Sequence, residues 1–333
     1  MHSARLPFPR ALAVTGLCLS LLCLASLLFG AGDVSVSRSL LALSGADDEQ
    51  ARFVVYQLRW ARTELALLVG AALGAAGLLL QSVTRNPLAE PGLMGVSAGA
   101  SFAVVLAIAL GASAASLNLM VAVGGSLVGC LLVLLVTQMR GVGDDPVRLV
   151  LAGAAFTGLL MALSNMLLLQ DQRTADEMRF WVIGALAGRP LDTFIWSLPG
   201  LIAGLLLALP LIPALAALSL GERVASGLGH HPQVTRLFTL VAVALLVGTA
   251  TAAAGPIGFV GLVVPFIARR LVGTDVRRSF ALAILIGPCI VLFADVLSRL
   301  VVRPYELPVG VITAFVGAPI LIAVVRSHRL PTL

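Results

Sequence analysis

Long apolar runs, separated by short polar segments, repeat along almost the whole chain. Each run is close to the length that a helix rising 1.5 Å per residue needs to cross a bilayer, about 20 residues. Ten runs are evident, at 11–30, 63–82, 93–110, 118–137, 147–169, 194–218, 237–254, 257–271, 279–300 and 308–325. The third and the eighth are short enough for partial or tilted crossings. The pattern predicts an all-α polytopic membrane protein with about ten transmembrane helices.

Two of the runs lead directly into segments broken by proline and glycine. The run at 63–82 is followed by the turn TRNPLAEPG at 84–92, and the run at 237–254 by Gly255-Pro256. Irregular backbone at membrane depth persists only where protein or a water-filled cavity covers it. Similar breaks after two helices of opposite direction are typical of inverted repeats in transporters. We therefore expect the turn at 84–92 to lie on a pathway.

Composition supports a membrane protein made of one domain. Hydrophobic residues make up 59% of the 333 and charged residues 11%, and the mean hydropathy is +1.05, all far from the values of a soluble domain. No polar segment is long enough for a separate globular unit, so we expect a single transmembrane domain over 1–333. The first apolar run exceeds the 7 to 15 residues or so of a signal-peptide core, which favours an uncleaved helix.

The charges predict an orientation. All 22 basic residues are arginines. With the N-terminus inside, 13 of the 22 arginines but five of the 16 acidic residues fall in the inner segments. This asymmetry follows the positive-inside rule and predicts that both termini are cytoplasmic. No basic cluster is interleaved with aromatic residues, so we expect no nucleic-acid partner.

The residue types also exclude several kinds of chemistry. A chain without lysine cannot contain the phosphate-binding loop GxxxxGK[ST]. We find no HExxH or CxxC, and predict no catalytic residue, metal site or cofactor. Asp295 is the clear acid inside a run, and its spacing from Arg299 predicts an i, i+4 ion pair rather than an ion-coupling site. Energy for transport must then come from a partner, with an ion-coupled secondary carrier as the less favoured alternative.

The segment at about 214–234, between the sixth and seventh runs, is a candidate port for that partner. It contains LGERVASGLG at 220–229, which predicts a short amphipathic helix bounded by glycines that permit sharp turns. Val224, Ala225 and Leu228 are predicted to form its apolar stripe. An interfacial helix lying on lipid is the alternative interpretation. The predicted coupling residues are Gly221, Glu222, Arg223, Val224, Ala225, Leu228 and Gly229.

Seven motifs occur in a fixed order: RNPLAEPGLMGVSAGAS (85–101), VRLVLAG (147–153), RFWVIGAL (179–186), LGERVASGLG (220–229), AGPIGFVGLVVP (254–265), ADVLSR (294–299) and ELPVGVITAFVGAP (306–319). With them the sequence resembles the FecCD family of binding-protein-dependent ABC transporters, the permeases for iron chelates and cobalamin. The residues of the RNPLAEPG and RFW motifs are most similar to those of the ferric-siderophore branch, notably the ferric-enterobactin-type permeases.

The resemblance implies a permease subunit with the type II ABC importer architecture in a bacterial inner membrane. It implies a second permease subunit, identical or sister, two cytoplasmic ATP-binding subunits that hydrolyse the ATP, and a periplasmic or lipid-anchored substrate-binding protein. The implied cargo is a ferric siderophore, with haem or vitamin B12 as alternatives. The particular chelate, the nature of the second permease and the identity of the binding protein stay open.

The resemblance also assigns roles to charged residues at the outer ends of two runs. Arginines at the positions of Arg59, Arg62 and Arg299 pair with acidic residues of the binding protein in the family. A guanidinium suits this role because its planar fork can hold a carboxylate with two hydrogen bonds. The alternative is that these arginines only extend their charged groups to the membrane–water interface, with Arg299 already paired to Asp295.

At the inner end, the resemblance places a cytoplasmic gate at Asn86 and Leu88. The alternative is that Pro87 and Pro91 simply end two helices. A second gate made of two hydroxyl residues occurs in one branch of the family, but this chain has Pro146-Val147 there. That second gate is not carried over.

Overall fold

The computed structural model describes residues 6–112, 119–138, 146–170, 172, 175, 178 and 183–326, and these residues form helices and turns with no β-strand. Each of the ten predicted apolar runs coincides with at least one helix in the described ranges. The helices are α1 (Phe8–Leu28), α2 (Val36–Leu43), α3 (Glu49–Phe53), η1 (Val54–Arg59), α4 (Trp60–Thr84), η2 (Pro91–Met94), α5 (Val96–Ala109), α6 (Leu119–Gln138), α7 (Pro146–Gln170), α9 (Thr193–Ala208), η4 (Leu209–Leu211), α10 (Ile212–Ser219), α11 (Glu222–Gly227), α12 (Pro232–Ala254), α13 (Val260–Val272), α14 (Val276–Leu300) and α15 (Val309–Arg326).

Six helical segments in the described ranges are long and apolar enough to cross a membrane. The remaining predicted runs correspond to shorter apolar helices, including α5 with 14 residues and α13 with 13. These two are the runs predicted to be short, and that prediction is confirmed. The sixth run contains α9, η4 and α10, because prolines at 210 and 213 interrupt its regular hydrogen bonding.

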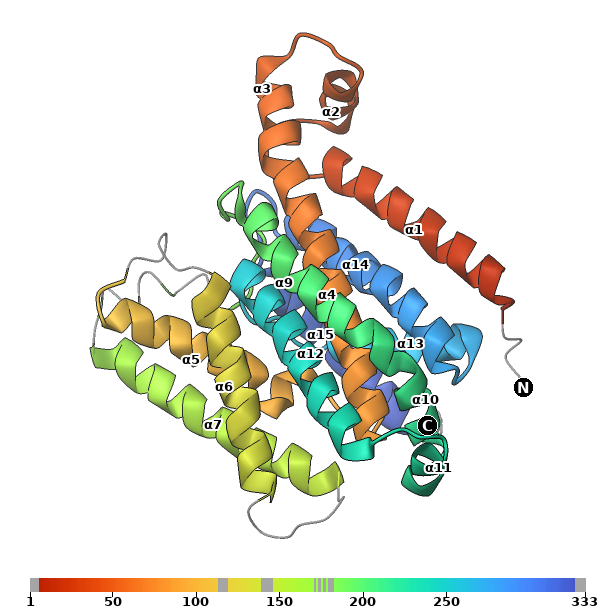
Figure 1. Cartoon of the computed structure of the whole chain (residues 1–333). Helices are drawn as coiled ribbons and strands as arrows, with labels where there is room; N and C mark the ends of the chain where they lie inside the picture. Colours follow the sequence, from red (N-terminus) through yellow and green to blue (C-terminus); the bar gives the residue numbers. More distant parts are fainter. Residues whose placement is uncertain are drawn as a thin grey trace.

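The central helix is α4, which continues without a break from α3 and η1. This 36-residue helix is 94% buried over its most apolar window, whereas the corresponding window of α1 is 17% buried. At 1.5 Å per residue it is about 54 Å long, well beyond the roughly 30 Å hydrocarbon core. Its first part therefore projects past the bundle together with α2, as Figure 1 shows. The sequence pattern did not predict this projection.

Small residues bring α4 close to its neighbours. A Cβ on Gly70 would lie 2.4 Å from the backbone nitrogen of Pro288 in α14, and a Cβ on Gly77 would lie 1.9 Å from the carbonyl oxygen of Gly261 in α13. Glycine is therefore required at both crossings. Close backbone approach through glycine is how helices associate where lipid removes the hydrophobic driving force.

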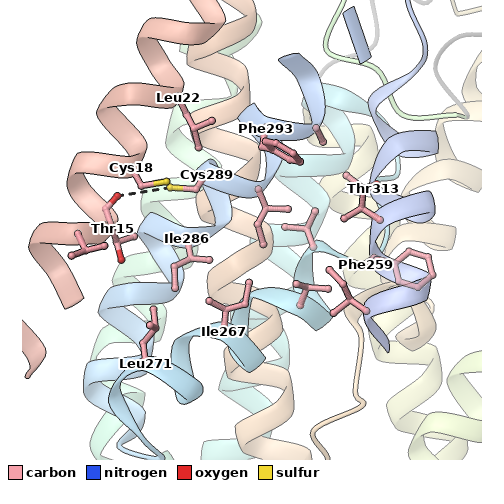
Figure 2. A pocket seen from close by; sticks show the side chains of 18 residues that line it. Thr15, Cys18, Leu22, Phe259, Ile267, Leu271, Ile286, Cys289, Phe293 and Thr313 are labelled. Carbon is pink, nitrogen blue, oxygen red and sulfur yellow. Dashed lines mark hydrogen bonds between the residues drawn. The ribbon is translucent and has the colours of Figure 1, made fainter. Parts of the chain in front are cut away.

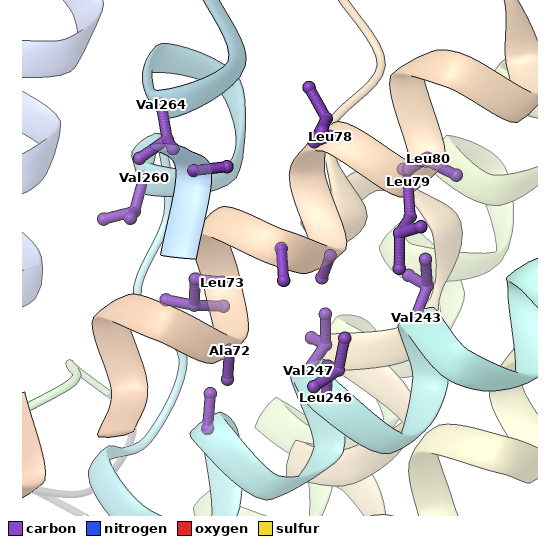
Figure 3. Packing of buried hydrophobic residues seen from close by; sticks show 14 of the residues in the cluster. Ala72, Leu73, Leu78, Leu79, Leu80, Val243, Leu246, Val247, Val260 and Val264 are labelled. Carbon is purple, nitrogen blue, oxygen red and sulfur yellow. The ribbon is translucent and has the colours of Figure 1, made fainter. Parts of the chain in front are cut away.

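Branched side chains fill the space between these crossings. Figure 3 shows Leu73 and Leu79 of α4 in one buried cluster with Val260 and Val264 of α13 and Val243 of α12. All five are buried. α4 thus fixes the relative positions of α12, α13 and α14, while α5, α6 and α7 form a second group beside them (Figure 1).

Candidate functional site

Charged side chains gather at both ends of α4. We call the end at Trp60 the capping end and the end at Thr84 the coupling end. At the capping end, Arg59 is 4% exposed, and its guanidinium donates at 2.9 Å to the carbonyl oxygens of Leu27 and Leu28 in α1. It also donates at 2.8 Å to Ser39 Oγ in α2 and at 3.3 Å to the Val34 carbonyl.

Arg299, on α14, also contacts the C-terminal end of α1. It is 1% exposed, and its Nη1 donates to the Ser26 carbonyl at 2.8 Å and to the Phe29 carbonyl at 3.3 Å. Its Nη2 pairs with Oδ2 of Asp295, which is fully buried. The i, i+4 ion pair predicted from the sequence is confirmed.

Arg62 completes the group. Its Nη2 lies 2.7 Å from Asp295 Oδ1 and its Nη1 lies 2.6 Å from Glu306 Oε2. The side chain of Arg62 is 13% exposed and that of Glu306 is 33% exposed, so this pair forms the outer edge of the group. We call Arg59, Arg62, Asp295, Arg299 and Glu306 the capping network.

The capping network closes the C-terminus of α1. A helix leaves its last four carbonyl groups without partners inside the helix. Here the Ala25 carbonyl accepts from the Phe29 N–H at 2.9 Å, and those of residues 26 to 28 accept from the two buried arginines. Positive charge at a helix C-terminus is also favourable for the helix dipole.

This geometry changes the interpretation of the predicted docking arginines. The structure brings Arg59, Arg62 and Arg299 together, as the prediction required. It buries Arg59 and Arg299, however, and occupies them with partners in the same chain. A buried guanidinium cannot contact another protein in this conformation, so of the three only Arg62 lies at the surface.

An exposed ion pair supports α2 and α3 beyond the capping network. Arg38 Nε lies 2.7 Å from Asp48 Oδ2, and Asp48 also accepts from the Ala51 N–H at 3.0 Å as the N-cap of α3. The hydrogen bond from Arg38, followed by the one from Ala51, holds the pKa of Asp48 below its ordinary value. Both contacts favour the ionised carboxylate.

At the coupling end, α4 finishes in a turn formed by residues 85–90. Arg85 adopts the left-handed conformation with φ 49°. The side chain of Asn86 accepts from the Leu88 N–H at 2.9 Å, which holds the turn in shape. Leu88 is 37% exposed. The two predicted gate residues therefore sit together in a defined turn at the end of the central helix.

The far end of this turn is fixed to α13. Glu90 Oε1 accepts from the backbone N–H of Phe259 at 2.5 Å, and Phe259 is the N-cap of α13. Pro91 packs on Gly261, where a Cβ would lie 2.9 Å from the proline ring. The contact joins residues 169 apart in the sequence. It connects the two proline- and glycine-broken segments that the sequence pattern singled out.

The predicted short helix in the loop at 214–234 is present as α11, between glycines with φ 114° at Gly221 and 82° at Gly229. Its apolar residues do not form one stripe. Ala225 is fully buried, whereas Val224 and Leu228 are 44% and 63% exposed. The exposed pair leaves an apolar surface at this end of the bundle. Arg223 is also exposed.

Glu222 links α11 to two other elements. Its Oε1 lies 3.3 Å from Arg85 Nη2 at the end of α4 and pairs with Arg236 Nη2 in α12. The side chains of Arg85, Glu222 and Arg236 are 36%, 30% and 26% exposed. We call this group the Glu222 bridge. Sequence reasoning assigned Glu222 to coupling but missed Arg85 and Arg236.

The structure also contains an apolar groove of about 430 Å³ between α1 and helices α13, α14 and α15. Figure 2 shows Leu22, Ile267 and Phe293 around it. The hydroxyl of Thr15, one of its few polar groups, donates to the Ala11 carbonyl at 2.8 Å. Such a lining offers nothing to bind a charged iron chelate, so the groove is not a substrate site. In the described residues no group of three or more His, Cys, Asp or Glu could hold a metal ion.

Comparison with known proteins gives a consistent result. A model of the FecCD transport family matches residues 18–327. The chain is 46% identical over 321 residues to the ferric enterobactin transport system permease protein of Escherichia coli K12, covering 95% of this chain and 96% of that protein. It is 34% identical over 300 residues to the Fe(3+)-citrate import system permease protein of Bacillus subtilis 168, covering 90% and 89%.

A solved structure has the same fold. It is a metal-chelate type ABC transporter in an inward-facing conformation, which superposes with a TM-score of 0.80 at 28% identity. The match covers 96% of this chain and 99% of that one. The central α4, the short α5 and α13 and the loop helix α11 thus belong to an architecture already seen in a transporter.

Proposed function

The chain belongs to the FecCD transport family, and we propose on that basis that it is the permease subunit of an ATP-binding-cassette importer that carries a ferric siderophore across a bacterial inner membrane. The observation that carries the proposal is the 46% identity to a ferric enterobactin permease over nearly the full length of both proteins. Iron-citrate and iron-hydroxamate permeases among the relatives support the same substrate class.

We propose that the coupling end faces the cytoplasm and that both termini lie there. The arginine distribution supports this orientation, because the inner segments then hold most of the positive charge. Two ATP-binding subunits would contact α11, whose exposed Val224 and Leu228 provide an apolar surface for them. A second permease subunit, identical or sister, would complete the pathway.

The capping end would then receive the substrate-binding protein. We assign the direct contact to Arg62, because it lies at the edge of the capping network and its partner Glu306 is one-third exposed. A carboxylate from the binding protein could replace Glu306 on Arg62 without disturbing the buried Asp295. Arg59 and Arg299 would support this contact indirectly, because they hold α1 in place. Charge contacts of this kind govern encounter rate and register more than affinity.

Transport would follow from alternating access. ATP binding would bring the two ATP-binding subunits together, α11 would move, and the turn bearing Asn86 and Leu88 would open or close the inner exit. The chelate would be held mainly by the binding protein, because a tight site inside the permease would slow release.

The test is reconstitution of the complete importer in liposomes with ATP inside. Uptake is compared for a ferric catecholate, a ferric hydroxamate and ferric citrate, each labelled with radioactive iron, and for cyanocobalamin labelled with radioactive cobalt. We expect ATP-dependent accumulation of at least one ferric chelate and none of cobalamin. Accumulation of cobalamin alone, or of an iron chelate by the permease without its ATP-binding partner, would contradict the proposal.

The docking assignment has its own test in the same system. Glu306→Gln should increase the association rate of the binding protein, because one competing carboxylate loses its charge, and Arg62→Gln should decrease it. Association rates measured at two salt concentrations would show both effects weakening at high salt. A Glu306→Gln variant that binds more slowly would argue against replacement at Arg62.

A further inference from the structure

The Glu222 bridge connects three segments that are far apart in the sequence. Arg85 follows the last residue of α4, Glu222 is the first residue of α11, and Arg236 lies in the second turn of α12. Arg85 and Glu222 are 137 residues apart. One carboxylate oxygen, Glu222 Oε1, contacts both guanidinium groups. A displacement of α11 can therefore change the distance from Glu222 to either arginine.

The backbone of Arg85 provides an independent observation. Its left-handed conformation is uncommon for a residue with a side chain other than that of asparagine or aspartate. Glycine would adopt it without a steric cost. Arg85 is the C-cap of α4, a place where helices commonly end with a left-handed residue. An arginine stands here instead of the usual glycine, and its side chain reaches Glu222.

The two ends of the turn at 85–90 are held in different ways. At Glu90 the attachment is a short hydrogen bond to the N-cap of α13, in a segment where Pro91 packs tightly on Gly261. At Arg85 it is an ion pair at 3.3 Å between side chains that are about one-third exposed. Exposed ion pairs exchange partners at little cost. The Arg85 end can therefore shift while the Glu90 end stays in place.

We propose that the Arg85–Glu222 contact transmits the movement of α11 to the turn bearing Asn86 and Leu88, with Arg236 as the alternative partner of Glu222. The proposal rests on the proposed importer function. When α11 moves toward α12, Glu222 stays with Arg236 and releases Arg85, and the turn changes shape about its fixed Glu90 end. When α11 returns, the contact forms again.

The experiment uses the complete importer in liposomes and measures the number of ATP molecules hydrolysed per chelate transported. The variants are Glu222→Gln, Arg85→Gly and Arg85→Lys. We expect the first two to raise the ratio at least tenfold, with ATP hydrolysis persisting. Arg85→Gly should melt no lower than the wild type, because glycine suits the left-handed backbone. Arg85→Lys keeps the charge and should stay closer to the wild-type ratio.

Arg278→Gln is the matched control. Arg278 lies at the same end of the bundle and pairs at 3.3 Å with Asp275, the N-cap of its own helix α14, so this pair links no separate segments. It should leave the ratio unchanged. Wild-type ratios in both Arg85→Gly and Glu222→Gln would overturn the proposal. So would loss of the ATP-binding subunit from the Glu222→Gln complex combined with normal coupling in Arg85→Gly, since Glu222 would then serve docking alone.

A second readout does not depend on transport. Leu88 is replaced by cysteine in a chain whose four native cysteines are changed to alanine, and labelling by a water-soluble maleimide is timed with and without ATP and vanadate. We expect the nucleotide to change the labelling rate severalfold, and Glu222→Gln to abolish that change. A nucleotide response that persists in Glu222→Gln would overturn the proposal. If the wild-type complex neither transports nor responds, the proposed function itself fails.

Discussion

The two ends of α4 carry charged groups of similar composition but opposite character. In the capping network, the paired side chains of Asp295 and Arg299 are 0% and 1% exposed. In the Glu222 bridge, all three side chains are between one-quarter and about one-third exposed. Breaking a buried pair leaves an unpaired charge away from water, whereas water solvates the members of an exposed pair as they separate.

This difference suits the two ends to different tasks. The capping network fixes α1, a helix that contributes little buried surface of its own, and a permanent attachment requires contacts that are costly to break. In the proposed transport cycle the coupling end changes conformation at every turnover, and contacts of about 0 to 1 kcal/mol can break and form again at that rate. Burial, rather than the number of charges, separates a structural network from a movable one.

The largest effect is expected from Asp295→Asn. Without this carboxylate, the buried guanidinium of Arg299 loses its counter-charge and Arg62 keeps only the partly exposed Glu306, at a cost of about 3 to 5 kcal/mol. The measurement is equilibrium unfolding in mixed micelles. Arg278→Gln, which removes an exposed pair, should cost about 0 to 1 kcal/mol. If the two variants unfold alike, burial is not what distinguishes the two ends.

A steric change at the capping end should have the next largest effect. A Cβ on Gly30 would lie 2.6 Å from Arg59 Nη2, so Gly30→Ala must displace a guanidinium whose hydrogen bonds hold α1 and α2. Overpacking of this kind costs about 1 to 3 kcal/mol. Gly32→Ala is the matched control, because nothing lies within 4 Å of its Cβ. Equal stabilities in the same unfolding assay would mean that Arg59 can relax freely.

Much of the fold could be predicted from the sequence, because the length and composition of each apolar run are enough to predict a membrane-spanning helix. The ten runs, the short α5 and α13, the helix α11 and the Asp295–Arg299 pair all follow from spacings within a few residues. The projection of α2 and α3 beyond the bundle could not be predicted in this way, because this segment is short, mixed in polarity and continuous with α4.

The roles of the arginines could not be predicted in the same way. Arg59 and Arg299 are marked as unusual by their charge and position, yet their partners are carbonyl groups of α1, which every residue possesses and no sequence pattern reveals. Likewise, Arg85 and Arg236 meet at Glu222 only because the end of α4 lies close to the starts of α11 and α12. The order of motifs predicts that such residues matter, but packing decides what they contact.

An effect of similar or smaller size is expected where the coupling end is attached to α13. Glu90→Leu leaves the Phe259 N–H without its acceptor, at a cost of about 1 to 3 kcal/mol, whereas Glu90→Gln keeps an acceptor oxygen and loses about 1 kcal/mol or less of charge interaction with the start of α13. Both costs are read from unfolding in micelles. Equal stability of Glu90→Leu and wild type would show that the Glu90 end is as loosely held as the Arg85 end.

The smallest effect should come from pH at the exposed pair of Arg38 and Asp48. Because the folded protein holds the pKa of Asp48 below its unfolded value of about 3.9, the contribution of the pair is present above that value and is lost as the pH falls through the folded pKa. Hydrogen exchange should therefore speed up in α2 and α3 below about pH 4, with α4 unaffected. Asp48→Asn should exchange fast at all pH values and remove this step. If hydrogen exchange still speeds up below about pH 4 in Asp48→Asn, the pH response belongs to another carboxylate at the capping end. If exchange in the wild type also speeds up in α4, the exposed pair is not independent of the buried capping network.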